Sequence, residues 1–206
     1  MEDQISEGGW HEAFGQFIAD LVTYPSAHFK APVLRKKAKL KWVQQGASWV
    51  PDTQDEIVPV FERVDPFKIF PAPGITNPQD GYMIEWLEFT RDDIYNLMGV
   101  PGFSSDAIRG VLDEYGKGGL KNWTGLNEKI EQSDINDQQV RVDSPAVFID
   151  CLEFSGPVRG MDLVEWGVPE KDVSDVDKDY EASVWMIGRW IIKAQLNPDP
   201  LNRRAY

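Results

Sequence analysis

The stretch DYEASVWMIGRWIIKA, residues 179–194, decides the fold. Two runs rich in β-branched and aromatic residues meet at Gly188, which predicts a β-hairpin. The chain then leaves through Asn197-Pro198-Asp199-Pro200. This exit can be neither a helix nor a central strand, because proline has no backbone N–H to donate. We therefore expect an antiparallel sheet in this part of the chain.

Further strands are predicted upstream of the hairpin. Four segments combine β-favouring residues with flanking turn signals, namely 57–64, 67–70, 82–89 and 146–154. Prolines at or near the ends of the first two confine them to edges or ends of a sheet. Ser155-Gly156-Pro157 predicts a turn after the last of the four. Residues 161–166 predict a short helical or irregular piece.

Three segments predict helices. In the first, apolar residues recur at three- and four-residue spacing and form one stripe: Trp10, Ala13, Phe14, Phe17, Ile18, Leu21 and Val22. We expect this stripe to pack against a sheet or another helix, and Pro25 ends the pattern. Thr90 begins a capping box for a short helix that runs through Met98. Ser104 or Ser105 caps a second short helix, which Gly116 closes.

Residues 33–42 predict a half-buried strand with a basic outer face. Leu34, Ala38, Leu40 and Trp42 fall on one face, which Lys36 interrupts. The basic side chains are a candidate surface for another subunit or for DNA: Arg35, Lys36, Lys37, Lys39 and Lys41. Lysines on an exposed strand also prevent edge-to-edge aggregation, so this purely protective role stays open.

Composition indicates one ordinary α+β domain over residues 1–206. The chain has 206 residues, of which 42% are hydrophobic and 27% charged. No apolar run approaches the roughly 20 residues that span a bilayer. A net charge of −13 argues against a module held on nucleic acid by phosphate attraction. The polar segment 124–143 is a candidate sub-boundary, and the apolar neighbours of Cys151 predict a buried structural thiol.

No motif for catalysis or for a cofactor stands out. His11 and His28 lack partners at metal-ligand spacing. Residues 175–179 imitate the start of a calcium loop, but Tyr180 replaces the turn glycine and Met186 the bidentate glutamate. An acidic loop entering a strand explains this segment better. Phosphate-binding glycine motifs and a nucleophile elbow are absent from the sequence.

Tryptophans and carboxylates leave one enzymatic alternative open. Five tryptophans fall in periodic elements, which favours core packing over an exposed sugar-stacking platform: Trp10, Trp42, Trp86, Trp185 and Trp190. In so acidic a chain, however, inspection does not exclude the carboxylate pair of a glycan-processing enzyme. Such an enzyme would need two carboxylates facing each other across a cleft.

Several segments resemble the portal (head-to-tail connector) proteins of short-tailed bacteriophages and related prophages. One is Glu7-Gly8-Gly9-Trp10-His11-Glu12-Ala13-Phe14, followed by Lys30-Ala31-Pro32-Val33. A second is Arg63-Val64-Asp65-Pro66-Phe67-Lys68-Ile69-Phe70-Pro71. The third extends from Glu165-Trp166-Gly167 through Tyr180 to Asn197-Pro198-Asp199-Pro200-Leu201 and Arg203-Arg204. These motifs are structural rather than catalytic, and their order along the chain carries the resemblance.

The resemblance implies the wing region of a portal, a mixed helix and sheet domain on the outside of a ring. In that family, typically twelve subunits surround a channel for double-stranded DNA, which passes without sequence-specific contacts. The implied partners are other portal subunits, capsid and scaffolding proteins, the terminase and tail adaptors. No enzymatic activity, cofactor or membrane is implied. The implied location is the portal vertex of the virion, and the bacterial host cytoplasm during assembly.

The resemblance also makes structural predictions. Because family members have several hundred residues, we expect Met1 and Tyr206 at exposed ends, with stem, clip and crown segments beyond Tyr206. We also expect an apolar or unpaired-edge surface larger than a free monomer tolerates. Two alternatives stay open, a small acidic glycan-processing enzyme and a protein–protein adaptor domain that uses a β-edge.

Overall fold

The structure is a computed structural model that describes residues 9–45, 48–75, 77, 79–120, 148–199 and 201. The strands are β1 (His28–Gln45), β2 (Ser48–Val64), β3 (Ile69–Pro71), β4 (Met83–Phe89), β5 (Ile149–Arg159), β6 (Asp179–Ile187) and β7 (Trp190–Leu196). The helices are α2 (Trp10–Thr23), α3 (Arg91–Asn96), α4 (Ser105–Tyr115) and α6 (Gly160–Glu165), with a 3₁₀ turn at Glu170–Asp172. The predicted α+β class is confirmed.

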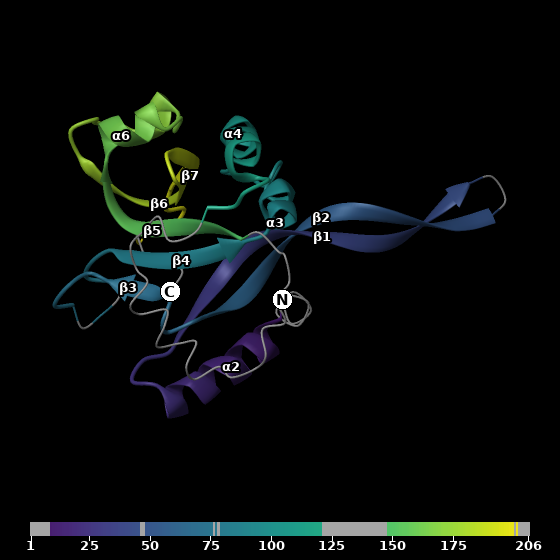
Figure 1. Cartoon of the computed structure of the whole chain (residues 1–206), viewed down its shortest axis with the longest axis horizontal. Coiled ribbons are helices and arrows are strands. Elements are labelled where there is room, and N and C mark those ends of the chain that lie inside the picture. Colours follow the sequence, from purple (N-terminus) through teal and green to yellow (C-terminus); the bar gives the residue numbers. More distant parts are fainter. Residues whose placement is uncertain are drawn as a thin grey trace.

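The described strands form two antiparallel sheets (Figure 1). β1 pairs only with β2, whereas the larger sheet has the order β3-β4-β5-β6-β7. The predicted closing hairpin is confirmed as β6 and β7, which meet at Gly188. Gly188 has a φ of +56°, and a Cβ there would lie 2.8 Å from the Tyr115 hydroxyl oxygen. The turn therefore needs glycine both for its backbone conformation and for space.

The predicted turn at Ser155-Gly156-Pro157 is wrong, because β5 continues through these residues to Arg159. Pairing with β4 stops at Ser155, whereas pairing with β6 continues past Pro157. Pro157 therefore lies where β5 has a free edge, the position that a strand proline requires. Gly156 is needed for close approach, since a Cβ there would lie 2.7 Å from the Tyr82 Cβ. Residues 146–147 of the predicted strand lie outside the described residues.

The two short helices and their caps are confirmed. The Thr90 hydroxyl accepts a hydrogen bond from the Asp93 N–H, and the Asp93 carboxylate accepts one from the Thr90 N–H. Helix α3 ends at Asn96, two residues before the predicted end. Ser104 caps α4 by accepting from the Ala107 N–H. Helix α6 occupies the predicted short helical piece.

Each face of the five-stranded sheet has its own core. One core joins the sheet to α3 and α4 through these buried residues: Ile94, Leu97, Ile108, Val111, Ile149, Cys151, Trp185, Ile187 and Ile192. The other lies beneath α6 and the segment after it: Val158, Leu163, Val168, Val173, Ala182 and Val184. Among the described residues no helix has the length and apolarity to cross a bilayer.

Helix α2 covers one face of the base of the β1–β2 ribbon. The Trp10 ring stacks on Phe29 and Phe61, with 5.9 Å between ring centroids in each case. The Arg63 guanidinium donates to both carboxylate oxygens of the buried Asp20, at 2.5 and 2.9 Å. The opposite face of the ribbon base turns toward the five-stranded sheet, so this base is held between a helix and a sheet.

Beyond its base, the β1–β2 ribbon projects away from the body of the protein (Figure 1). The prediction of a half-buried strand at residues 33–42 is therefore wrong in its burial, although the strand exists and is longer than predicted. Leu34 is 43% exposed, and Leu40 and Trp42 are each 61% exposed. Trp42 accordingly does not belong to the core. The predicted sub-boundary at 124–143 and the two chain ends lie outside the described residues.

Candidate functional site

The projecting ribbon, residues 33–59, is amphipathic, and we call it the arm. Directly paired residues of an antiparallel ribbon share a face, and successive residues alternate between faces. The pairs Leu34 with Pro59 and Trp42 with Pro51 place their side chains on one face. The apolar face of the arm consists of Leu34, Ala38, Leu40, Trp42, Trp49, Pro51, Ile57 and Pro59.

Nothing in the described part of the chain covers this apolar face. Trp49 is 63% exposed, which matches the exposure of Leu40 and Trp42. Full burial of a large apolar side chain is worth about 1.5–3 kcal/mol relative to leaving it in water. Because the apolar side chains of the arm stay exposed to water, the described residues do not gain this free energy. Rows of apolar side chains of this kind mark interaction surfaces.

The opposite face of the arm is charged. Lys39 and Lys41 both approach one Glu56 carboxylate oxygen, at 3.9 and 3.8 Å. Lys36 lies on the apolar face, where its Nζ is 2.8 Å from an Asp55 oxygen. Exposed pairs such as these contribute about 0.2–1 kcal/mol each. Four of the five predicted site residues are thus exposed on the arm, Lys37 being the fourth.

The fifth predicted site residue, Arg35, points toward the body instead. Its guanidinium forms a two-pronged contact with the Glu62 carboxylate, at 2.7 and 2.6 Å. It also lies 5.9 Å from the centre of the Trp185 ring. Arg35 therefore fixes the base of the arm against β6 and is not available to a partner in the way that the exposed lysines are.

A buried ion cluster anchors the arm to the five-stranded sheet. The Lys30 ammonium, on β1, donates to a Glu85 oxygen at 2.8 Å and to a Glu153 oxygen. Glu85 and Glu153 lie directly opposite each other on β4 and β5, and all three residues are buried. We call these three residues the anchor. Two like charges at paired positions repel, so the lysine between them is what makes the arrangement stable.

The protonation of the anchor follows from these contacts. Burial opposes the charge of Lys30, but Glu153 and Glu85 outweigh it and raise the pKa of Lys30. Burial also opposes the charge of Glu153, but Lys30, and more weakly Lys193, outweigh it and lower the pKa of Glu153. The Ser183 hydroxyl donates a further hydrogen bond to Glu153 at 3.2 Å. Both shifts favour the charged forms, the ammonium of Lys30 and the carboxylate of Glu153.

Trp185 and Lys193 extend the anchor toward the edge of the sheet. Trp185 pairs with Glu153, and Lys193 pairs with Trp185. The Lys193 ammonium lies 5.3 Å from the centre of the Phe103 ring and 5.5 Å from a Trp185 ring. Burial lowers the pKa of Lys193, although Glu153 opposes this shift.

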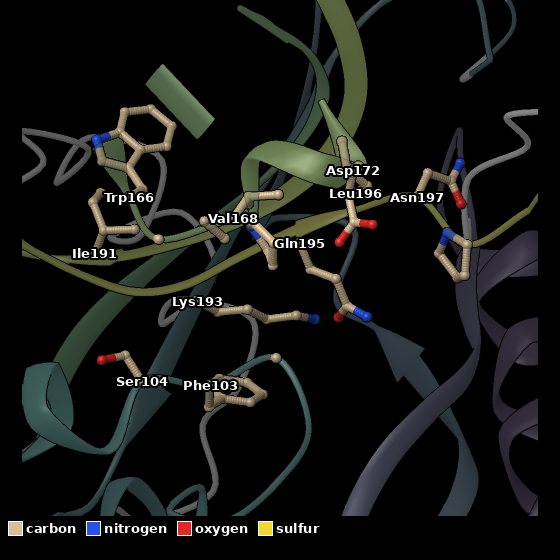
Figure 2. A pocket seen from close by; sticks show the side chains of 15 residues that line it. Phe103, Ser104, Trp166, Val168, Asp172, Ile191, Lys193, Gln195, Leu196 and Asn197 are labelled. Carbon is tan, nitrogen blue, oxygen red and sulfur yellow. The ribbon is translucent and has the colours of Figure 1, made fainter. Parts of the chain in front are cut away.

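Two adjoining cavities share Lys193 as a lining residue. One, of about 670 Å³, also contacts Lys30, Arg35 and Glu153. The other, of about 720 Å³, follows the outer edge of β7, where the Ser104 N–H donates to the Ile192 carbonyl oxygen at 2.8 Å. Figure 2 shows Lys193 extending between Phe103 and Gln195 there. The lining of the first cavity contains three cations, Lys30, Arg35 and Lys193, and three carboxylates, Glu153, Glu181 and Asp199. Because these charges balance, the cavity offers no net attraction to an anion.

The facing carboxylates do not have the properties of a glycosidase pair. A general acid of that reaction needs a raised pKa so that it holds a proton at neutral pH. The pKa of Glu153 is lowered, and Lys30 occupies the space between Glu153 and Glu85. The two most exposed tryptophans of the described residues, Trp42 and Trp49, lie on the arm rather than beside this pair.

The segment that imitates a calcium loop and the single cysteine both have structural roles. The Tyr180 hydroxyl bonds the Asp175 backbone from both sides, accepting from its N–H at 2.8 Å and contacting its carbonyl oxygen at 3.1 Å. The acidic loop is thus closed by a side chain at the position where a calcium loop has glycine. No cluster of three or more metal-ligand side chains occurs among the described residues. Cys151 is fully buried, as predicted, and burial raises the pKa of its thiol.

Sequence reasoning missed the anchor. Lys30 is buried, and its two partners lie 55 and 123 residues away in the sequence. One signal was available, because Glu85 and Glu153 interrupt two strongly apolar strands. Carboxylates at such positions must be paired when they are buried.

A comparison of the chain with known protein families finds no matching family model. A comparison with curated proteins also finds no significant match. The arm, the anchor and the resemblance of the segments quoted above are therefore the grounds on which a function can be inferred.

Proposed function

We propose that this chain forms the wing region of a portal protein, a structural subunit of the ring through which a phage genome is packaged and ejected. The observation that carries this proposal is the uncovered apolar face of the arm. A free monomer gains nothing from an arm with two exposed tryptophans, whereas a subunit of an assembly buries them against a neighbour. The resemblance of the quoted segments to portal proteins indicates that this assembly is a portal ring.

The anchor supports the same proposal. Side chains and segments that are ordered on binding reduce affinity, because their lost freedom opposes association. Lys30 and Arg35 fix the base of the arm to the sheet before any partner arrives. A fixed arm presents its apolar face in one orientation. This suits a ring, in which every subunit must meet its neighbour at the same angle.

The charge distribution fits a channel protein. Residues 33–59 carry five basic and three acidic side chains, a net charge of +2, whereas the chain totals −13, so the remainder carries −15. A strongly acidic body does not bind DNA phosphates, and double-stranded DNA can pass without adhering. The net positive charge of the arm, which no single lysine determines, then favours its approach to the acidic body of another subunit. Other portal subunits, capsid and scaffolding proteins, terminase and tail adaptors are the partners proposed, at the portal vertex, with no enzymatic activity.

Electron microscopy of the purified whole gene product tests this function. We expect closed rings with a central channel that admits a DNA duplex. A variant with Leu40 and Trp42 both replaced by serine should give far fewer rings, while Lys37→Ser, on the other face of the arm, should leave ring formation unchanged. Monomers at every concentration, or open filaments without rings, would contradict the proposal.

A further inference from the structure

A second apolar surface lies on the outer side of α2. Four side chains, spaced so that they share one helix face, are exposed: Phe14 by 41%, Ile18 by 43%, Leu21 by 54% and Val22 by 84%. We call them the outer stripe. The predicted stripe of α2 is therefore only partly buried. Its inner part, which includes Trp10 and Ala13, packs on the ribbon base. In the outer stripe, Phe14 contacts the Trp10 and Phe17 rings of its own helix, and all four side chains remain more than 40% exposed.

The apolar face of the arm continues the surface that α2 covers. Ile57, Pro59 and Phe61 alternate along β2 and therefore point to the same side of the ribbon. Phe61 contacts Trp10 of α2, whereas Pro59 and Ile57, further out, are exposed. One ribbon face thus begins under a helix of the same chain and runs on uncovered. A second helix beside the first would continue the layer.

Charge favours another copy of this chain as the source of that helix. Helix α2 has no lysine or arginine, and its exposed acid is Glu12, since Asp20 is buried and paired with Arg63. The arm is the positive part of an otherwise strongly acidic chain. Two arms or two bodies would repel each other, whereas an arm attracts the body of another copy. Complementary surfaces at different places on one chain give a head-to-tail contact, which closes into a ring when the rotation fits.

Dimensions agree with this match. The outer stripe spans about 12 Å along the helix, at 1.5 Å per residue. On the apolar face of the arm, the segment from Ala38 to Trp42 spans about 13 Å, at roughly 3.3 Å per residue. The contact involves far fewer side chains than the roughly 20–30 per partner of a standard interface. A single contact is therefore weak, and stable association requires the closed ring, in which every copy makes two such contacts.

We propose that the apolar face of the arm of one copy docks on the outer stripe of α2 of the next copy. Each α2 then lies between its own ribbon base and the arm of its neighbour. This inference rests on the proposed ring, and it names the surfaces that make the ring. It also explains why the apolar stripe of α2 is wider than the part that the ribbon base covers.

Cross-linking of two different single-cysteine variants tests the contact. Leu40→Cys and Ile18→Cys are prepared as separate whole gene products, mixed in equal amounts and treated with a short bismaleimide. The native Cys151 is fully buried and does not compete. Because both positions are exposed, neither substitution disturbs the core, and thermal denaturation checks this. We expect at least ten times more covalent dimer in the mixture than in either variant alone.

The controls separate this inference from the ring itself. Lys37→Cys, on the charged face of the arm, should not cross-link to Ile18→Cys above background. Dimers formed equally well by Leu40→Cys alone would show an arm-to-arm contact and overturn the inference. Rings that form without any cross-link between the two positions would also overturn it, while leaving the portal function intact. Failure to form any oligomer would refute both.

Discussion

Replacement of Lys30 by methionine should destabilise the protein severely. Methionine keeps most of the side-chain volume but removes the ammonium that binds Glu85 and Glu153. These two carboxylates are 7% and 3% exposed and directly opposed in register. Removal of one partner from a buried ion pair costs about 3–5 kcal/mol, because it leaves an uncompensated charge. At about 2–4 °C per kcal/mol for a chain of this size, the melting temperature should fall by about 6–20 °C.

The pH dependence of this loss has a definite sign. In the wild type, the lowered pKa of Glu153 gives stability that is present above the unfolded value, about 4.3, and is lost as pH falls through the folded value. Lys30, with a raised pKa, contributes fully at every pH below its unfolded value. In Lys30→Met, burial acts on Glu153 without this counterion and should raise its pKa. As pH falls, Glu153 therefore takes up a proton, and the variant no longer holds an uncompensated buried charge there. The stability gap to wild type should therefore be smaller at pH 5 than at pH 8.

Urea unfolding followed by tryptophan fluorescence measures this gap, since Trp185 lies beside the anchor. Lys37→Met is the matched control, because Lys37 is exposed on the arm, and it should change stability by less than about 0.5 kcal/mol. A Lys30→Met variant within about 1 kcal/mol of this control would refute the role of the anchor. A gap that widens as pH falls from 8 to 5 would refute the assigned charges.

Three further predictions concern single positions. Gly188→Ala should lower stability by about 1–3 kcal/mol in thermal denaturation, because alanine is strained at a positive φ and its Cβ would meet the Tyr115 hydroxyl. An unchanged melting temperature would contradict the hairpin geometry. Thr90→Ala should cost about 0.5–2 kcal/mol in urea unfolding, since it removes the cap that bonds the Asp93 N–H, whereas Thr90→Ser should retain most of the stability. Cys151 should resist a thiol-reactive dye in the native protein and react fully in urea, because it is buried and its pKa is raised; rapid labelling of the folded chain would be evidence against its burial.

Local signals in the sequence predicted local structure well. The capping box at Thr90, the cap at Ser104 and the turn at Gly188 each rest on a backbone requirement that a few adjacent residues satisfy. Ser155-Gly156-Pro157 carried the same kind of signal and misled. There the glycine makes room for Tyr82, and the proline occupies a free strand edge. The position of Tyr82 and the end of β4 create these two requirements, so residues 155–157 alone do not reveal them.

Burial and long-range pairing could not be predicted from local patterns. Alternation in residues 33–42 correctly indicates a ribbon with one apolar face, but it does not say whether the same chain or another covers that face. The pairing of Lys30 with Glu85 and Glu153 depends on the register of three strands. The outer stripe of α2 illustrates the same limit, because periodicity marks it as apolar without identifying its partner.

Sedimentation velocity tests most directly whether the apolar face of the arm is a subunit interface. The whole gene product and its Leu40→Ser, Trp42→Ser double variant are compared over a range of concentrations. Both side chains are 61% exposed in the described chain, so the variant should fold with an unchanged melting temperature. We predict that the wild type sediments as a large closed oligomer and the variant as a monomer. Oligomers of the same size and stability in both proteins would contradict the proposal.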